Sequence, residues 1–159
     1  MRRDFFKYLY ELMQQNDNIV AVTGDLGYGG FDKIRDEFPD RFYNVGAAEQ
    51  AMMGIACGLS LEGKIPVVYS ITPFLLYRPF ETLRTYIDHE KIKVVMIGSG
   101  RDSDYAHDGF SHYAGDDKLF MQHFKNITSV WPEISEEMIE VVNRAMESKT
   151  ATYINLKRG

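Results

Sequence analysis

The sequence predicts an α/β domain with a doubly wound, mostly parallel sheet of about six strands and helices on both faces. Three observations lead to this prediction. Short apolar runs of strand length alternate along the chain with segments of helical periodicity. Strands separated by helices are joined by right-handed crossovers, which make neighbouring strands parallel. The chain has 159 residues, of which 45% are hydrophobic, so residues 1–159 suit one compact domain.

The first part of the chain predicts helix, strand, helix and strand in turn. Residues 4–15 carry apolar side chains at helical spacing, and the apolar run 19–22 follows as a buried strand. A second helical segment, 31–38, is stopped by Pro39, and residues 42–45 form a short strand that ends at a glycine.

The middle of the chain repeats this order. Residues 47–61 are small and apolar and close at a glycine, which predicts a helix, and 65–70 form the next strand. Residues 74–89 are helical, 93–97 form a strand, and 99–115 are expected to be a long polar loop.

The last part adds helix 117–124, strand 127–130, helix 135–146 and strand 152–156. In doubly wound sheets, ligands bind beyond the carboxyl ends of the strands. The residues to inspect therefore follow four strand ends: Gly24, Gly46, Ser70 and Gly98.

Composition excludes several classes of partner. The formal net charge is -5 with both signs interspersed, so we expect no nucleic-acid partner. No uninterrupted apolar run approaches the roughly 20 residues of a membrane span, so no membrane contact is expected. The single cysteine, Cys57, rules out an internal disulfide and fits a reducing compartment, which predicts a cytoplasmic protein.

The helix that begins near Glu49 carries the most informative motif. A carboxylate at the first turn of a helix beyond a parallel strand suits a ligand site, although it also complements the positive helix N-terminus. The run Pro39-Asp40-Arg41-Phe42, with Glu49-Gln50 after the strand, resembles the pyrimidine-binding domain of transketolases and deoxyxylulose-phosphate synthases. The resemblance implies that Glu49 is catalytic and hydrogen-bonds the pyrimidine ring of thiamine diphosphate.

Three aromatic residues share one face of the helix predicted at 74–89: Phe74, Tyr77 and Phe80. An aromatic stripe is usually part of a core. Here the resemblance implies that these side chains stack against the flat aminopyrimidine ring of the cofactor. Arg78 and its neighbours Glu81 and Arg84 also match a pattern of the small subunits of split transketolases.

The loop predicted at 99–115 contains a second family motif. His107 and His112 do not have standard zinc spacing, so no metal site is expected. Asp108, Gly109 and His112 instead match a transketolase motif, which implies that His112 is catalytic and that His112 and Asp108 bind substrate. Arg101 is a further substrate-binding candidate, through a phosphate or carboxylate, unless it pairs on the surface with a neighbouring aspartate.

The segment 24–30 is rich in glycine and follows a strand, which suits an anion-binding loop or simply a mobile turn. It resembles the opening of the diphosphate-binding signature of thiamine enzymes, which makes Asp25 a candidate cofactor contact. Leu26 replaces the last glycine of that signature, and no asparagine follows at the required distance. We therefore expect Mg²⁺ and the diphosphate to be bound by a partner chain.

The resemblance implies one subunit of a split enzyme without a third domain, since it extends from about Val20 to Leu156. The expected assembly is a heterotetramer with a diphosphate-binding subunit, in which this chain also forms a homodimer contact. The expected reaction is transfer of a two-carbon ketol unit between sugar or sugar-phosphate substrates. Two alternatives remain: the beta subunit of a 2-oxo-acid decarboxylase or dehydrogenase, and a non-catalytic regulatory domain of the same fold.

Overall fold

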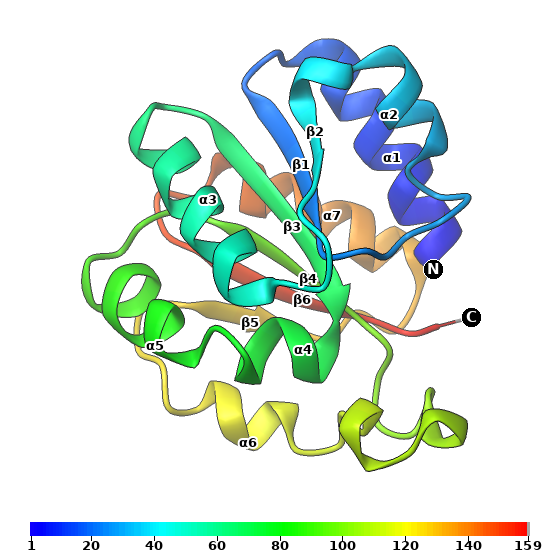
Figure 1. Ribbon diagram of the computed structural model, residues 1–159, viewed down its shortest axis with the longest axis vertical. Coiled ribbons are helices and arrows are strands. Elements are labelled where there is room, and N and C mark those ends of the chain that lie inside the picture. The colour runs from blue at the N-terminus through cyan, green and yellow to red at the C-terminus, as the bar shows by residue number, and fades with distance from the viewer. Residues whose placement is uncertain (159) are drawn as a thin grey trace.

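The computed structural model describes residues 1–158 and contains one six-stranded sheet in the order β2-β1-β3-β4-β6-β5 (Figure 1). Every neighbouring pair of strands is parallel, so the predicted doubly wound fold is confirmed. The strands are β1 Ile19–Thr23, β2 Phe42–Asn44, β3 Ile65–Ile71, β4 Val95–Ser99, β5 Thr128–Val130 and β6 Thr152–Leu156.

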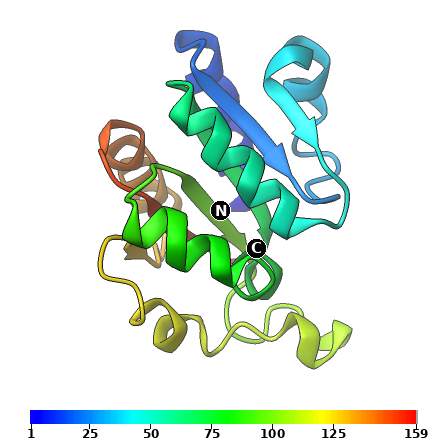
Figure 2. The same cartoon turned by 60° about the vertical axis from the view of Figure 1, so that its left-hand side comes forward.

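Helices cover both faces of this sheet. The main helices are α1 Arg2–Gln15, α2 Asp32–Glu37, α3 Glu49–Leu61, α4 Thr72–Tyr77, α5 Phe80–Thr82, α6 Asp117–Met121 and α7 Ser135–Glu147. One apolar cluster joins α1, α2 and α7 to one face, and a second joins α3, α4 and α6 to the other. Figure 2 shows α3 in teal and α4 and α5 in green in front of the sheet, and α7 in orange behind it.

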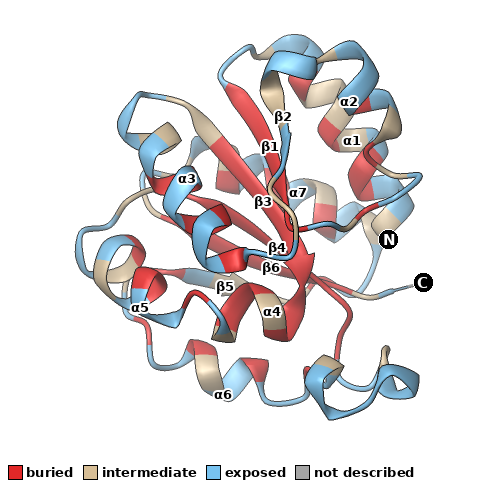
Figure 3. Cartoon of the chain, in the orientation of Figure 1, coloured by how far each residue is buried: buried red, intermediate tan, exposed pale blue. Residues whose placement is uncertain are grey.

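Alternation along the strands explains the two clusters. In β1, Ile19 and Ala21 belong to the first cluster, whereas Val20 and Val22 belong to the second. Successive side chains of a strand point to opposite faces, so a run that is apolar throughout is buried on both sides. Figure 3 shows β1, β3, β4 and β6 as almost entirely buried and the outer faces of the helices as exposed. None of the helices within residues 1–158 is long and apolar enough to cross a membrane.

The segment expected as one helix over 74–89 is divided in three. Helix α4 ends at Tyr77, α5 begins at Phe80, and a π-helix, Leu83–His89, follows. The break falls at Arg78 and Pro79, because proline has no N–H to donate and its ring clashes with a preceding helical turn. Arg78 therefore stands at a joint between two short helices.

The polar loop after β4 is closed at its base. Asp102 and Ala114 form an isolated antiparallel bridge, and the Ala114 N–H donates to the Asp102 carbonyl over 2.9 Å. Two 3₁₀ turns lie between them, Ala106–Asp108 and Phe110–His112. The two ends of the loop therefore lie close together, and the residues between them form a compact surface loop.

The parallel registers bring several chain segments to one edge. Thr23 is aligned with Asn44 and Tyr69, and Ile71 is aligned with Ser99. The segments that follow these strands are residues 24–30 (the glycine loop), the start of α3, the start of α4 and the loop after β4. These are the segments in which the sequence places the candidate functional residues.

Candidate functional site

Glu49, the first residue of α3, is a buried carboxylate at the carboxyl edge of the sheet. Only 1% of its surface is exposed. The Ser70 hydroxyl at the end of β3 donates to Oε1 over 3.1 Å, and Arg78 Nη1 donates to Oε2 over 2.7 Å. A Cβ at Gly24 would lie 3.2 Å from Oε1, so the chain after β1 also packs closely on this carboxylate. Both carboxylate oxygens are therefore held in fixed directions.

Arg78 links Glu49 to the aromatic part of the site. Its guanidinium carbon lies 3.7 Å from the centroid of the Phe74 ring. Phe74 in turn makes an edge-to-face contact with His112, with ring centroids 4.8 Å apart. The structure therefore brings three predicted site residues, Glu49, Phe74 and His112, into one chain of contacts. No sequence signal indicated that Arg78 pairs with Glu49, because the pair depends on the break before Pro79.

The other two aromatic candidates point elsewhere. The Tyr77 hydroxyl donates to Asp116 Oδ1 over 2.5 Å, and its ring packs edge-on against Phe120 at 4.8 Å. Phe80 also packs on Phe120, at 5.6 Å between centroids. Burial, together with the hydrogen bond to Asp116, raises the pKa of Tyr77 above its ordinary value. Tyr77 and Phe80 thus face α6 and not the Glu49 carboxylate, which differs from the expected trio.

His112 lies half-buried in the loop after β4. Its Nδ1 is 3.0 Å from the Ser111 hydroxyl, and its ring centroid is 6.3 Å from that of Tyr105. Asp108 is exposed and pairs with His107, with 3.3 Å between Oδ2 and Nε2. The loop therefore places His112 beside the aromatic contact and leaves Asp108 at the surface.

The Arg101 side chain, expected either to bind substrate or to pair with a neighbouring aspartate at the surface, is buried. The side chain is only 6% exposed, and Nε donates to the Asn155 side-chain oxygen over 2.9 Å. Nη2 donates to the backbone carbonyls of Pro132 and Asn155, and Nη1 pairs with Glu133, each over 2.8 Å. The guanidinium is thus committed to β6 and the segment after β5, and it does not pair with the neighbouring Asp102 or Asp104. Its role in this structure is to anchor the base of the loop.

Asp25 follows Gly24 in an unusual backbone conformation, with φ 58°. Its N–H donates to the Asn44 side chain over 2.9 Å, and its carboxylate accepts the Tyr28 hydroxyl. The carboxylate is exposed, so it remains available to a ligand. Within residues 1–158, no group of three or more His, Cys, Asp or Glu side chains is gathered in a way that would hold a metal ion.

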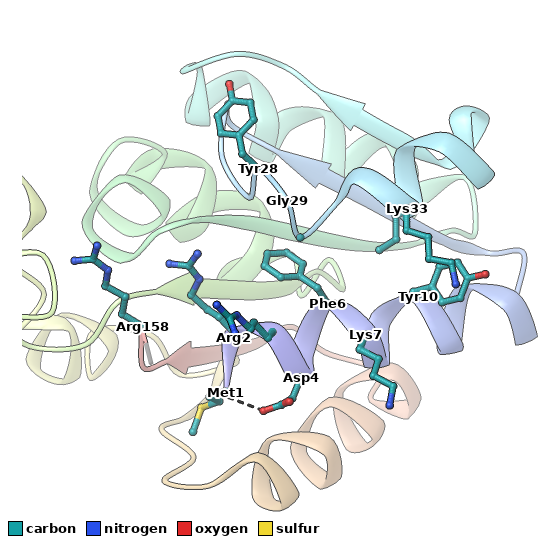
Figure 4. A pocket seen from close by; sticks show the side chains of 13 residues that line it. Met1, Arg2, Asp4, Phe6, Lys7, Tyr10, Tyr28, Gly29, Lys33 and Arg158 are labelled. Atoms are coloured by element: carbon teal, nitrogen blue, oxygen red, sulfur yellow. Dashed lines mark ion pairs between the residues drawn. The ribbon is translucent and has the colours of Figure 1, made fainter.

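A second feature of the site is a cationic hollow of about 940 Å³ between α1 and the glycine loop (Figure 4). Its lining contains one acidic side chain, Asp4, and five basic ones: Arg2, Arg3, Lys7, Lys33 and Arg158. The Nε of Arg2 is buried without a hydrogen-bond partner among the described residues. Five basic side chains around an unpaired N–H donor of Arg2 favour the binding of an anionic ligand. Sequence inspection did not reveal this hollow, because Lys33 and Arg158 lie far along the chain from the basic residues of α1.

Tyr105 connects the cationic hollow to His112. Its hydroxyl accepts a hydrogen bond from Arg2 Nη1 over 2.8 Å, and the Arg158 guanidinium carbon lies 4.9 Å from its ring centroid. Gly100 makes this position of Tyr105 possible, because a Cβ there would lie 2.3 Å from the tyrosine ring. With φ +88°, Gly100 also has a backbone conformation that disfavours other residues. The cationic hollow and His112 are therefore adjacent, with Tyr105 between them.

Fold and site together define a doubly wound α/β domain with a buried carboxylate, an aromatic face and a cationic hollow at the carboxyl ends of its parallel strands. The sequence model of the family described as "Transketolase, pyrimidine binding domain" matches residues 1–159. The chain belongs to this family. At the level of the family, this indicates a thiamine-diphosphate-dependent transferase.

Individual relatives agree with this assignment. The chain is 30% identical over 159 residues to the "Putative transketolase C-terminal section" of Methanocaldococcus jannaschii, covering 99% of this chain and 50% of that protein. It is 33% identical over 140 residues to one subunit of the apulose-4-phosphate transketolase of Actinobacillus succinogenes, covering 88% of this chain and 45% of that protein. The chain thus spans about half the length of these relatives.

A solved structure shows the same fold. The structure described as "Split gene transketolase, inactive beta4 tetramer" superposes with a TM-score of 0.86 at 33% sequence identity. The match covers 99% of this chain and 51% of that one.

Proposed function

We propose that this chain, residues 1–159, is the pyrimidine-binding subunit of a two-subunit thiamine-diphosphate enzyme that transfers a ketol unit between sugar or sugar-phosphate substrates. The observation that carries the proposal is Glu49, buried at the carboxyl edge of the sheet and held by Ser70. When bound, the cofactor supplies a nucleophilic carbon and an electron sink. The pyrimidine end of that cofactor fits the residues present, because a buried carboxylate and the flat Phe74 ring lie within one group of contacts.

Each side chain has a specific part in this proposal. Glu49 holds a proton at the pyrimidine ring nitrogen, and Ser70 fixes the direction of the carboxylate by its hydrogen bond to Oε1. Phe74 contacts the ring face and fixes the position of His112. His112 donates a hydrogen bond to a substrate oxygen, and Asp25 and Asp108 remain candidates for peripheral cofactor and substrate contacts.

The cationic hollow supports a phosphorylated substrate. Arg2 and Arg158 both contact Tyr105, whose ring lies next to His112. A sugar phosphate whose reacting carbonyl meets His112 would extend its phosphate past Tyr105 toward these cations. Basic side chains in a hollow attract phosphate over a distance and then bind it by charge-assisted hydrogen bonds.

A partner chain supplies what this chain does not contain among its described residues. No metal-binding group is gathered there, and the glycine loop departs from the diphosphate signature at Leu26. We therefore propose that Mg²⁺ and the diphosphate are bound by a second kind of subunit, in a heterotetramer with a homodimer contact between two copies of this chain. One relative is named as a subunit of a transketolase and another as an "inactive beta4 tetramer", and both names support a need for such a partner.

Reconstitution tests the proposal. The chain is combined with a candidate diphosphate-binding subunit, and ketol transfer is measured on a panel of ketoses with and without phosphate. Glu49→Gln should lower kcat by about 100-fold or more, the range seen when a positioned acid or base is removed. Glu62→Gln, at the exposed far end of α3, is the matched control and should leave kcat unchanged. Full turnover by Glu49→Gln would exclude the proposed role.

The cationic hollow has its own test in the same assay. Arg158→Gln should raise KM for phosphorylated ketoses by about tenfold, the effect of one charge-assisted hydrogen bond, and leave KM for the unphosphorylated sugars unchanged. An equal change for both substrate classes would show that the hollow does not bind phosphate.

A further inference from the structure

Arg78 contacts two residues that the proposed function assigns to the cofactor ring. Its Nη1 donates to Glu49 Oε2 over 2.7 Å. The same guanidinium covers the Phe74 ring, with 3.7 Å from the guanidinium carbon to the ring centroid. A guanidinium is planar, carries N–H donors in its plane and stacks on aromatic faces. An aminopyrimidine ring is also flat and presents a ring nitrogen at its edge, with which a carboxyl group can share a proton.

Arg78 is also on the solvent side of Glu49. Ser70 and Gly24, which contact Oε1, are buried, whereas the Arg78 side chain is 44% exposed. The Oε2 atom is the one that Arg78 holds. Among the contacts described for Glu49 within residues 1–158, Arg78 is therefore the one that a ligand arriving from solvent meets first.

The backbone around Arg78 allows its side chain to change partner. Arg78 and Pro79 lie between α4 and α5, outside both helices. Because Arg78 belongs to neither helix, its side chain can rotate without disturbing α4 or α5. The guanidinium is about half exposed, so water competes with Glu49 for its N–H donors.

We infer that the Arg78 guanidinium stands in for the aminopyrimidine ring in the free subunit and turns away when the cofactor binds. The inference rests on the proposed function of Glu49. In the free chain Arg78 neutralises a buried carboxylate and covers the apolar Phe74 face, which keeps the empty site ordered. Cofactor binding then replaces one planar group by another on the same two residues, and a proton taken up from solvent lies between Glu49 and the ring nitrogen.

Cofactor affinity in the reconstituted enzyme is the first test. Arg78→Ala removes the competing internal ligand, so calorimetry should show a Kd for thiamine diphosphate about two- to fivefold lower than in the wild type. Arg78→Lys keeps the charge but loses the planar fork, and its Kd should fall between the two. Arg84→Ala, an exposed arginine of the following π-helix, is the matched control and should leave the Kd unchanged. A higher Kd in Arg78→Ala would overturn the inference and make Arg78 a cofactor contact.

A double-mutant cycle is the second test and does not depend on turnover. Thermal unfolding is measured for the wild type, Arg78→Ala, Glu49→Gln and the double variant, first as free chain and then in the cofactor-loaded complex. Coupling between Arg78 and Glu49 should be present in the free chain and absent in the loaded complex. Coupling that persists after loading would refute the exchange. If instead Glu49→Gln leaves both cofactor affinity and turnover at the wild-type level, the proposed function of Glu49 is wrong. This result differs from persistent coupling, which refutes only the exchange of Arg78.

Discussion

Arg101 provides the sharpest test of the structural role assigned to a residue that the sequence offered as a substrate ligand. Replacing Arg101 by methionine keeps much of the side-chain volume but removes its hydrogen bonds. Three buried acceptors lose their donor: the Asn155 side-chain oxygen and the backbone carbonyls of Asn155 and Pro132. At about 1 kcal/mol or more for each unsatisfied buried acceptor, the free energy of unfolding should fall by about 3 kcal/mol. For a domain of this size, that lowers Tm by about 6–12 °C.

The assay is urea unfolding followed by circular dichroism on the free chain, with thermal unfolding as a second measurement. Glu133→Gln is the matched control, because Glu133 receives an Arg101 hydrogen bond but is itself 62% exposed. It should reduce stability much less than Arg101→Met does, because solvent screens the exposed Glu133 carboxylate. The reasoning is refuted if Arg101→Met unfolds within about 1 kcal/mol of the wild type while it raises KM in the reconstituted enzyme, because that pair of results describes a substrate ligand.

Three further predictions concern buried groups. Gly24→Ala places a Cβ 3.2 Å from Glu49 Oε1, so calorimetry on the reconstituted enzyme should show several-fold weaker cofactor binding; Gly54→Ala, whose Cβ meets no atom within 4 Å, should bind normally. Burial raises the pKa of Asp117 above its ordinary 3.8, so its folded form holds a proton more tightly than its unfolded form. Stability from this group is complete below about pH 4 and is lost as pH rises through the folded pKa. The unfolding free energy of the wild type relative to Asp117→Asn should therefore fall as pH rises above about 4 in urea titrations, and a constant difference contradicts this. Burial also raises the pKa of Cys57 to about 11. A thiol reagent at pH 8 should therefore label it slowly in the folded chain and rapidly in denaturant; equal rates would show that it is accessible.

The fold could be predicted from the sequence because the four inner strands, β1, β3, β4 and β6, are buried on both faces. The run 65–69 has no charged side chain, and segments of helical periodicity separate it from the next strand, so few arrangements other than a parallel sheet are compatible with the pattern. Glu49 was found for a related reason. It follows a strand and opens a helix, and the carboxyl edge of a parallel sheet is where such a residue meets the ends of other strands.

The contacts between side chains of the site were harder to predict from the sequence, because they join segments that are distant in the chain. The helix predicted over 74–89 placed Phe74, Tyr77 and Phe80 on one face. In the structure the helix is broken at Arg78 and Pro79, and Tyr77 and Phe80 both pack on Phe120 of α6. Arg101 stands near two aspartates in the sequence, yet its guanidinium reaches Glu133 instead.

The cationic hollow illustrates the same limit. Arg2 and Arg158 belong to opposite ends of the sequence, and Tyr105 brings them to one place. Neither arginine is part of a motif that marks an anion site, so their charges became informative only after the chain had folded.

The bridge between Asp102 and Ala114 has a consequence for how this domain can diversify. It closes the loop at its base, and Arg101 fastens the same base to β6, so the sheet does not depend on what lies between. The intervening segment carries Asp108 and His112 and is mostly exposed, with Phe110 at 88%. The tip of this segment can therefore be exchanged: residues 106–113 of a relative with another substrate preference can be grafted with little loss of stability, because Asp104 and Tyr105, which hold the base of the loop, are kept. New specificity can therefore arise in this domain without any change in the elements that build its sheet.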